Sequence, residues 1–221
     1  MDVRMVCAEP EYMPEAAVSV RLALWISKLP GTSKITVALD RMHIWASEYT
    51  ERSTGRTVPK KVICDVDELL VGWESEYPNL KPWCNWRQAN SIVDIGSATT
   101  PPNAEHTVCD IEAPFALGKL RVESKQVKNK VQEQSHLQSG IGQMATIRDF
   151  SEGDFLAVAV PYSPRLMQLA RRFQEGPIFR RTEIGLVLVH NHGPVDWITP
   201  DTERWKAFRT MAAGTLGRVK H

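Results

Sequence analysis

Two acids and a lysine stand out in a stretch that otherwise has the composition of a core hairpin. In "HTVCDIEAPFALGKLRVESKQ", residues 106–126, Asp110 precedes a short loop, and Glu123 and Lys125 follow it. Side chains two apart on a strand share a face, so Glu123 and Lys125 point the same way. A hairpin turn would bring Asp110 beside Glu123, because it reverses the chain between them.

Two carboxylates placed this close repel each other, so they either take up protons or share a cation. The expected cation is Mg²⁺ or Mn²⁺, a hard ion that completes its coordination with water, a backbone carbonyl and a substrate phosphate. The ammonium of Lys125 would lie next to the metal, where it can hold an attacking water or the charge that develops on phosphorus. The residue types therefore predict metal-dependent phosphodiester hydrolysis.

The elements that must position these residues can be read from the chain on either side. "EHTVCDIEA" and "KLRVESK" are predicted strands, and the loop "PFALG" with its late glycine is typical of a hairpin. A helix in "SHLQSGIGQMATIRDF" follows, in which Gly140 and Gly142 would permit close packing on a sheet. The apolar "DFLAVAVP" predicts a strand covered on both faces. An amphipathic helix in "SPRLMQLARRFQE" and a second buried strand in "IGLVLVHNHGPVDWI" complete the order.

The N-terminal part begins with a predicted helix over residues 15–29, which starts after Pro14 and ends at Pro30 and Gly31. "KITVALDRMHIWASEY" predicts a strand, "TERSTGRTVPK" a hairpin loop, and "KKVICDVDELLVGWE" a returning strand. The fold class expected is α/β, a mixed central sheet flanked by helices. Residues 105–221 would form the catalytic core, and residues 1–104 an N-terminal helix and β extension that belongs to the same domain or serves substrate recognition.

The acids and the lysine, in this order, resemble the PD-(D/E)XK nuclease superfamily, whose members have a restriction-endonuclease-like fold. Asp110 matches the first acid, and Glu123, Ser124 and Lys125 match the ExK tripeptide on the following strand. The resemblance implies that Asp110, Glu123 and the carbonyl of Ser124 hold Mg²⁺ or Mn²⁺ while Lys125 positions or activates water. Where the family usually has a proline before the first acid, this chain has Cys109.

The resemblance also extends to two helices. The family often carries a glutamine or a basic residue on the helix after the ExK strand, and Gln143 in "GIGQM" is similar, with Gln138 as the weaker candidate. The family's leading helix, here residues 15–29, sometimes contributes an extra glutamate. These features imply an endonuclease acting on DNA. The alternative is a catalytically inactive nuclease-fold module that binds nucleic acid or assembles with a partner protein.

Several other residues compete for roles in a site. Asp94 in "SIVDIG" would replace Asp110 as the metal ligand if that segment pairs with the ExK strand, although spacing favours Asp110. Glu112 shares a face with Asp110, as an accessory ligand or as a charge at the rim. Asp65 and Asp67 fit a turn better than a site. The triplet "HNH" at His190–His192 predicts the end of a strand, because no cysteine or acid adjoins it in the sequence to complete a metal site.

Composition limits the class of protein. The net charge is +1, no apolar run approaches the length of a membrane span, and the first residues lack the order of a signal peptide, so a cytoplasmic protein is expected. Four cysteines without CxxC spacing argue against zinc or disulfides. A polyanionic partner, DNA in the first place, would meet two basic groups, and a homodimer would suit cleavage of both strands. These groups are Lys119, Arg121, Lys125, Lys128 and Lys130, and then Arg171, Arg172, Arg180 and Arg181.

Overall fold

The computed structural model describes residues 10–40, 44–46, 49–50, 57–58, 61–70, 81–84, 91–96, 109–147, 150–191 and 195–216. Its helices are α1 (Glu15–Ile26), α3 (Val66–Leu70), α5 (Glu133–Ala145), α6 (Pro164–Glu175), α7 (Pro177–Thr182) and α8 (Glu203–Leu216). Its longer strands are β1 (Lys34–Leu39), β6 (Lys81–Cys84), β7 (Ser91–Gly96), β8 (Ile111–Phe115), β9 (Gly118–Ser124), β10 (Asp154–Pro161), β11 (Gly185–Val189) and β12 (Val195–Ile198).

These strands form one open, mixed sheet. The order in the described part is β12-β11-β10-β9-β8-β1-β7-β6. β9, β10 and β11 run parallel, and every other neighbouring pair that the structure describes is antiparallel. The α/β class with a mixed sheet flanked by helices is therefore confirmed, and the C-terminal half follows the predicted order of elements.

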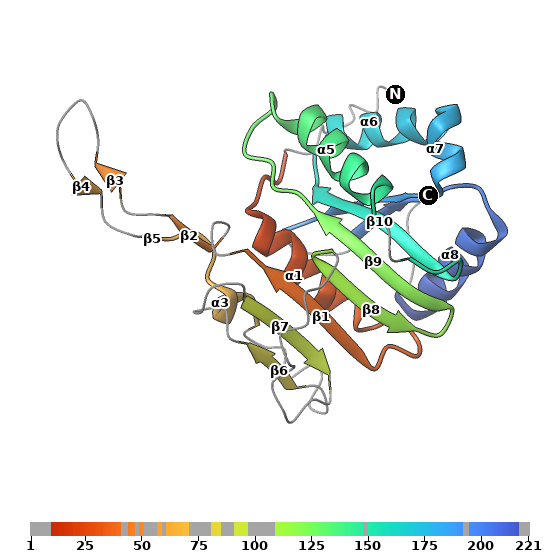
Figure 1. Ribbon diagram of the computed structural model, residues 1–221, viewed down its shortest axis with the longest axis horizontal. Coiled ribbons are helices and arrows are strands. Elements are labelled where there is room, and N and C mark those ends of the chain that lie inside the picture. The colour runs from red at the N-terminus through yellow and green to blue at the C-terminus, as the bar shows by residue number, and fades with distance from the viewer. Residues whose placement is uncertain are drawn as a thin grey trace, which may run out of the picture.

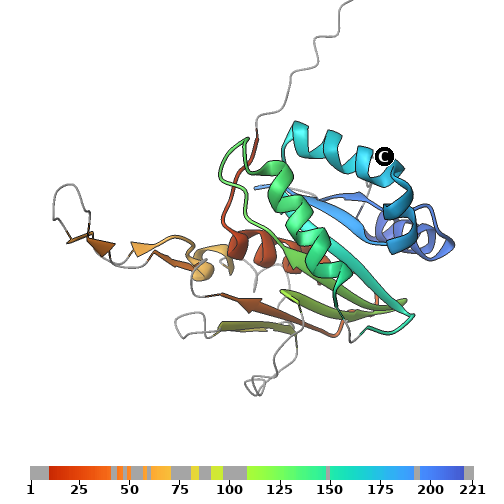
Figure 2. The ribbon, with the colours of Figure 1, turned by 45° about the horizontal axis from the view of Figure 1, so that its top comes forward.

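Helices cover the two faces of the sheet unequally (Figures 1 and 2). α1 and α8 pack on one face, where Trp205 and Phe208 of α8 join the larger hydrophobic core. α5, α6 and α7 pack over β10 and β11 on the other face and enclose a second core. Every residue of β10 and β11 is buried, whereas burial alternates along β1 and β8. The continuous apolar runs thus mark the strands covered on both sides, as expected.

The first helix is more central than an amphipathic reading implies. Ten of the twelve residues of α1 are buried, because the helix lies against the sheet within the larger core. Pro14 occupies the N-cap position, and the helix ends at Ile26, before Leu29. Gly31 has a φ of +76°, and a Cβ there would lie 2.8 Å from the backbone nitrogen of Ala116. The glycine therefore permits the chain to turn closely against the hairpin.

The hairpin that carries the acids has a shorter loop than expected. Phe115 pairs with Gly118, so only Ala116 and Leu117 lie between the strands, and "PF" belongs to β8. Gly118 has a φ of +143°, which a glycine adopts without strain. Asp110 lies in a bend immediately before β8, outside the strand in which it was expected. Residues 105–108 of that predicted strand lie outside the described residues.

Two short antiparallel pairs flank or overlap the predicted hairpin loop, residues 50–60, of which 51–56 and 59–60 lie outside the described residues. β2 (Trp45–Ala46) pairs with β5 (Lys61–Val62), and β3 (Tyr49–Thr50) pairs with β4 (Thr57–Val58), in an arm that leaves the sheet (Figure 1). The returning strand was predicted too long, since α3 begins at Val66. Asp65 accepts a hydrogen bond from the backbone N–H of Glu68, as a helix cap does. In the described part of the chain, no helix is long and apolar enough to cross a membrane.

Candidate active site

Asp110 is held beside the C-terminal end of β9 by backbone hydrogen bonds on two sides. Its carbonyl accepts a hydrogen bond of 2.8 Å from the N–H of Ala38 in β1. Its carboxylate oxygen Oδ2 accepts one of 2.7 Å from the N–H of Ser124, the last residue of β9. The antiparallel register of β8 and β9 produces this contact, because it places the start of β8 next to the end of β9. The sequence-predicted first acid therefore lies at the predicted tripeptide.

Glu123 and Lys125 share one face at this end of the strand, as their spacing predicted. The Nζ of Lys125 donates a hydrogen bond of 2.7 Å to Oε1 of Glu123. The backbone N–H of Lys125 donates to the carbonyl of Ala159 in β10, which continues the parallel pairing past the end of β9. Glu123 is buried, with 9% of its surface exposed. The pair is therefore fixed between two neighbouring strands and largely withdrawn from water.

A third acid, Glu15, reaches this cluster from the first turn of α1. Its Oε2 lies 3.9 Å from Nζ of Lys125 and accepts a hydrogen bond of 3.4 Å from the N–H of Gln126. Glu15 is 8% exposed. The resemblance allowed for a glutamate from the leading helix, but Glu15 itself was not among the predicted site residues. The signal that could have identified it is an acid that opens an otherwise apolar helix.

Among the described residues, three acids and one lysine meet at this end of β9, and the pKa of Asp110 is raised there. Burial raises the pKa of Asp110, the charges of Glu123 and Glu15 raise it further, and the value reaches about 7. The hydrogen bond from Ser124 and the charge of Lys125 oppose this rise only in part. At neutral pH the cluster consequently shares a proton, the first of the two outcomes expected for adjacent carboxylates.

Lys125 keeps its proton in this environment. Burial acts to lower the pKa of Lys125, but the hydrogen bond to Glu123 and the charges of Glu15, Glu123 and Asp110 outweigh it, so the pKa lies above its ordinary value. An ammonium of this kind donates hydrogen bonds and stabilises negative charge, but it does not accept a proton from water at neutral pH. Of the two roles expected for Lys125, holding water fits this state and activating it by deprotonation does not.

The sheet order separates the two candidates for the first acid. Asp94 lies on β7, opposite Thr36 of β1, and β8 and β1 stand between β7 and β9. Three strand spacings amount to roughly 14 Å. The pairing of "SIVDIG" with the ExK strand, on which Asp94 depended, is therefore wrong. Glu112 lies directly opposite Arg121 in the hairpin, and its carboxylate is 3.3 Å from the Arg121 guanidinium.

The helix after β9 passes directly over the site. A Cβ on Gly140 of α5 would lie 2.6 Å from Cγ1 of Val158 and 3.2 Å from Cγ of Lys125, so the absence of a side chain permits this approach. Gly142 has open space around it, and its predicted packing role is wrong. Gln143 is exposed on α5, one turn beyond Gly140. The hydroxyl of Ser124 is fully buried and has no hydrogen-bond partner in the described part.

Whether these residues fit a divalent cation depends on their donor atoms and on their charge. Among the described residues, no three His, Cys, Asp or Glu side chains converge as ligands around one point. Glu123 is turned onto Lys125 and Asp110 onto the N–H of Ser124. Carboxylate oxygens are ligands that Mg²⁺ accepts, and burial first, then the charges of Glu123 and Glu15, raise the pKa of Asp110. The donor types suit Mg²⁺ or Mn²⁺, but in this arrangement the described side chains do not converge as a ligand set.

The predicted basic surface is only partly available to a polyanion. Arg121 is buried and paired with Asp154 at 2.9 Å as well as with Glu112, and Lys119 lies 3.9 Å from Glu112. These two cations were expected beside the site, but they lie in the first half of β9 and pair with Glu112 and Asp154. The exposed basic residues among the described part include Lys128, Lys130, Arg171, Arg172, Arg180 and Arg181.

The "HNH" triplet has acidic neighbours that the sequence did not reveal. Nδ1 of His190 lies 2.9 Å from Oε1 of Glu11, and Nε2 lies 3.0 Å from Oδ2 of Asp196. The hydrogen bond to Asp196 raises the pKa of His190, and Glu11 adds to this effect against the opposing influence of burial. The expectation that no acid lies nearby was wrong. The contacts tie the segment before α1 to the end of β11, and His192 lies outside the described residues.

The cysteines that the structure describes with their side chains, Cys64 and Cys109, are buried free thiols, in keeping with the absence of a zinc or disulfide pattern. Cys7 and the side chain of Cys84 lie outside the described part.

Comparisons of the chain with models of protein families, with curated proteins and with solved structures gave no match.

Proposed function

We propose that this chain is a metal-dependent nuclease that hydrolyses phosphodiester bonds in DNA, in the manner of the PD-(D/E)XK nucleases it resembles. The observation that supports the proposal best is the convergence of Glu15, Asp110, Glu123 and Lys125 at one end of β9. Buried acids in excess over bases destabilise a fold, so their retention favours a functional site.

The chemistry assigned to each residue follows from its state. Asp110, Glu123 and Glu15 would hold Mg²⁺ or Mn²⁺, which supplies charge neutralisation for the phosphate when it is bound. Lys125 remains an ammonium and donates hydrogen bonds to water or to a phosphate oxygen. Asp110, with a pKa of about 7, is half-protonated at neutral pH and gives up its proton when the cluster is neutralised. Occupancy is therefore expected to rise as the pH increases through about 7.

The test is cleavage of supercoiled plasmid DNA in Mg²⁺ by the wild type, Glu123→Gln and Lys125→Met. We expect each substitution to reduce the rate by roughly 10³-fold, since several kcal/mol of charge stabilisation is lost. Glu175→Gln changes an exposed acid at the end of α6 and should cleave at the wild-type rate. Equal rates in all four proteins would refute the assignment of the site.

The second candidate is a nuclease fold that binds nucleic acid without cutting it. The observation in its favour is the direct contact of Lys125 with Glu123, together with the absence of a three-ligand metal arrangement in the described residues. Thermal unfolding with increasing Mg²⁺ separates the two. A working site should raise the melting temperature by a few degrees at about 10 mM Mg²⁺, and Glu123→Gln should abolish the rise. DNA binding with no cleavage and no such rise would favour the inactive module.

A further inference from the structure

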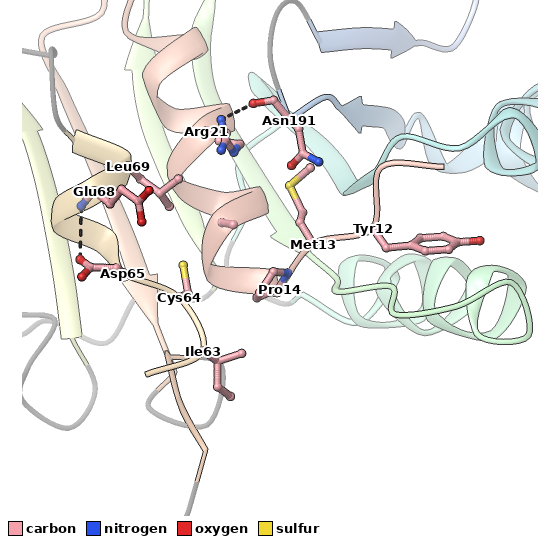
Figure 3. Close-up of a pocket in the computed structure, with 11 residues that line it drawn as sticks. Tyr12, Met13, Pro14, Arg21, Ile63, Cys64, Asp65, Glu68, Leu69 and Asn191 are labelled. Carbon is pink, nitrogen blue, oxygen red and sulfur yellow. Dashed lines mark hydrogen bonds between the residues drawn. The ribbon is translucent and has the colours of Figure 1, made fainter. Parts of the chain in front are cut away.

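A pocket of about 540 Å³ opens on the other side of the helix start that carries Glu15. Its walls come from residues 12–14, from α1, from the segment 63–69 and from Asn191 after β11 (Figure 3). Pro14 lines the pocket and immediately precedes Glu15 in the acid cluster. The pocket and the candidate active site therefore flank the same turn of the chain. A volume of this size falls within the range of small-ligand sites.

Arg21 is the cation of this pocket, and it is only partly paired. Its Nη1 donates a hydrogen bond to the carbonyl of Asn191, a contact that Figure 3 shows. Its Nε is buried and has no hydrogen-bond partner in the part of the chain that the structure describes. A buried donor without an acceptor costs free energy, so the pairing of this guanidinium is incomplete among the described residues. Because Asn191 fixes one side of the planar guanidinium, the direction of its remaining donors is fixed as well.

Two acids from the segment around α3 also line the pocket. Asp65 is engaged as the cap of α3, whereas the side chain of Glu68 is exposed. Both acids and Arg21 influence the same thiol: burial raises the pKa of Cys64 to about 11, Arg21 acts to lower it, and Asp65 and Glu68 raise it. The three charges thus line the same pocket as Cys64, whose thiol stays protonated and is no nucleophile at neutral pH. A ligand with only one sign of charge would be repelled from one wall.

The remaining walls are apolar. Ile63 keeps 42% of its surface exposed at the pocket, and Met13, Ala17 and Leu69 also line it. A matching ligand has flat apolar faces and carries acceptors on one edge and donors on another. Nucleobases have this chemistry, and α1 rises only about 9 Å between Glu15 and Arg21. One nucleotide can bridge that separation.

We propose that this pocket binds a guanine base of the nucleic acid substrate, an inference that rests on the proposed phosphodiesterase function. Guanine presents two acceptors, O6 and N7, to the free edge of the Arg21 guanidinium, the pairing by which arginine selects guanine in DNA. Its N1–H and N2–H₂ form a two-donor edge that the carboxylate of Glu68 accepts. Adenine and thymine lack both of these edges, and cytosine lacks the two-donor edge. The site would make cleavage depend on a guanine next to the scissile phosphate.

Binding of free nucleotides tests the pocket separately from cleavage. We would titrate the wild type with dGMP, dAMP, dCMP and dTMP without divalent cation, by calorimetry. We expect dGMP to bind at least about tenfold more tightly than the others. Arg21→Met and Glu68→Gln should each weaken dGMP binding by about tenfold or more, the effect of losing a bidentate contact. Glu175→Gln, at an exposed position on α6, is the matched control for Glu68→Gln and should bind dGMP normally.

Two variants, Arg21→Met and Glu68→Gln, are used so that misfolding of one does not decide the test. Arg21→Met removes the bond to Asn191, so its fold must be checked, but Glu68 is exposed and Glu68→Gln should fold normally. Equal affinity for all four nucleotides, or unchanged dGMP affinity in a folded Glu68→Gln, would overturn the guanine site. Selective dGMP binding with an intact plasmid would support the pocket and count against cleavage alone. Plasmid cleavage that Glu68→Gln leaves unchanged, without guanine near the cuts, would count against the pocket alone.

Discussion

Two groups of charged side chains lie along one face of β9, and they are balanced differently. In the first, Arg121 at the middle of the strand bonds to Asp154 and Glu112, and Lys119 near its start lies near Glu112, so two bases meet two acids. At the C-terminal end, three acids meet one base among the described residues. That cluster consists of Glu15, Asp110, Glu123 and Lys125.

The difference separates a structural cluster from a candidate functional one. Asp154 accepts hydrogen bonds from both the Arg121 side chain and the N–H of Ser151, so its charge is fully compensated. Burial, and then the charges of Glu123 and Glu15, raise the pKa of Asp110 to about 7 against one backbone hydrogen bond from Ser124. A buried cluster that serves only stability gains nothing from surplus charge. Asp110 and Asp154 are the same residue type, but the partners that the fold gives them place them in different electrostatic environments.

The largest loss of stability should come from breaking the ion pair between Arg121 and Asp154. Removing the acid Glu123 from the cluster at the C-terminal end of β9 should cost much less. Arg121→Met leaves the buried Asp154 without its partner and should cost about 3–5 kcal/mol in the free energy of unfolding. Glu123→Gln removes one of three repelling acids and should cost less than about 1 kcal/mol while abolishing cleavage. Urea denaturation followed by fluorescence measures both. A cost of several kcal/mol for Glu123→Gln would mean that the two groups are alike.

The next effect is a stability gain that depends on pH. The folded-state pKa of Asp110, about 7, exceeds the ordinary value of 3.8, so the folded state binds a proton that the unfolded state releases between these values. The stabilising contribution of this proton is complete below pH 3.8 and is lost as the pH rises through about 7. Asp110→Asn keeps an acceptor for Ser124 without the charge, and should stabilise the protein at about pH 8 by on the order of 2–4 kcal/mol, with little change at about pH 4.

Unfolding free energies of the wild type and Asp110→Asn at several pH values test this expectation. Asp154→Asn is the matched substitution at the other end of β9 and should destabilise the protein at about pH 8, because it weakens the bond to Arg121. Parallel pH profiles for the wild type and Asp110→Asn would show that Asp110 carries no surplus charge.

The smallest effect concerns the two glycines of α5. Gly140→Ala would force a methyl group to within 2.6 Å of Val158 and 3.2 Å of Lys125, so we expect a loss of about 1–3 kcal/mol and slower cleavage. Gly142→Ala meets open space and should stabilise by about 0.5–1 kcal/mol, since alanine favours the helix. Thermal melts of the two variants give both values. The same sign for both would show that α5 does not lie against the site as described.

Much of the local structure around the site was predictable because it depends on short-range geometry. The alternation of side chains along a strand predicted that Glu123 and Lys125 share one face. The apolar run of β10 predicted a strand covered on both sides. α6 begins with Ser163 followed by Pro164, residues typical of a helix start, and the Ser163 hydroxyl accepts a hydrogen bond from the N–H of Leu166. The loop length was overestimated, because Phe115 can close the hairpin within the strand.

The order of elements, the hairpin and the pair of charges at the end of β9 follow from the pattern of the chain alone. The choice of the acid that joins this pair depends on the sheet, because the placement of β8 and β1 between β9 and β7 excludes Asp94 and leaves Asp110. The sequence likewise did not indicate that Glu15 lies beside Lys125 or that Asp154 pairs with Arg121. Periodicity reports the contacts of neighbours in sequence, whereas charge balance in a core depends on partners that folding brings together over long separations.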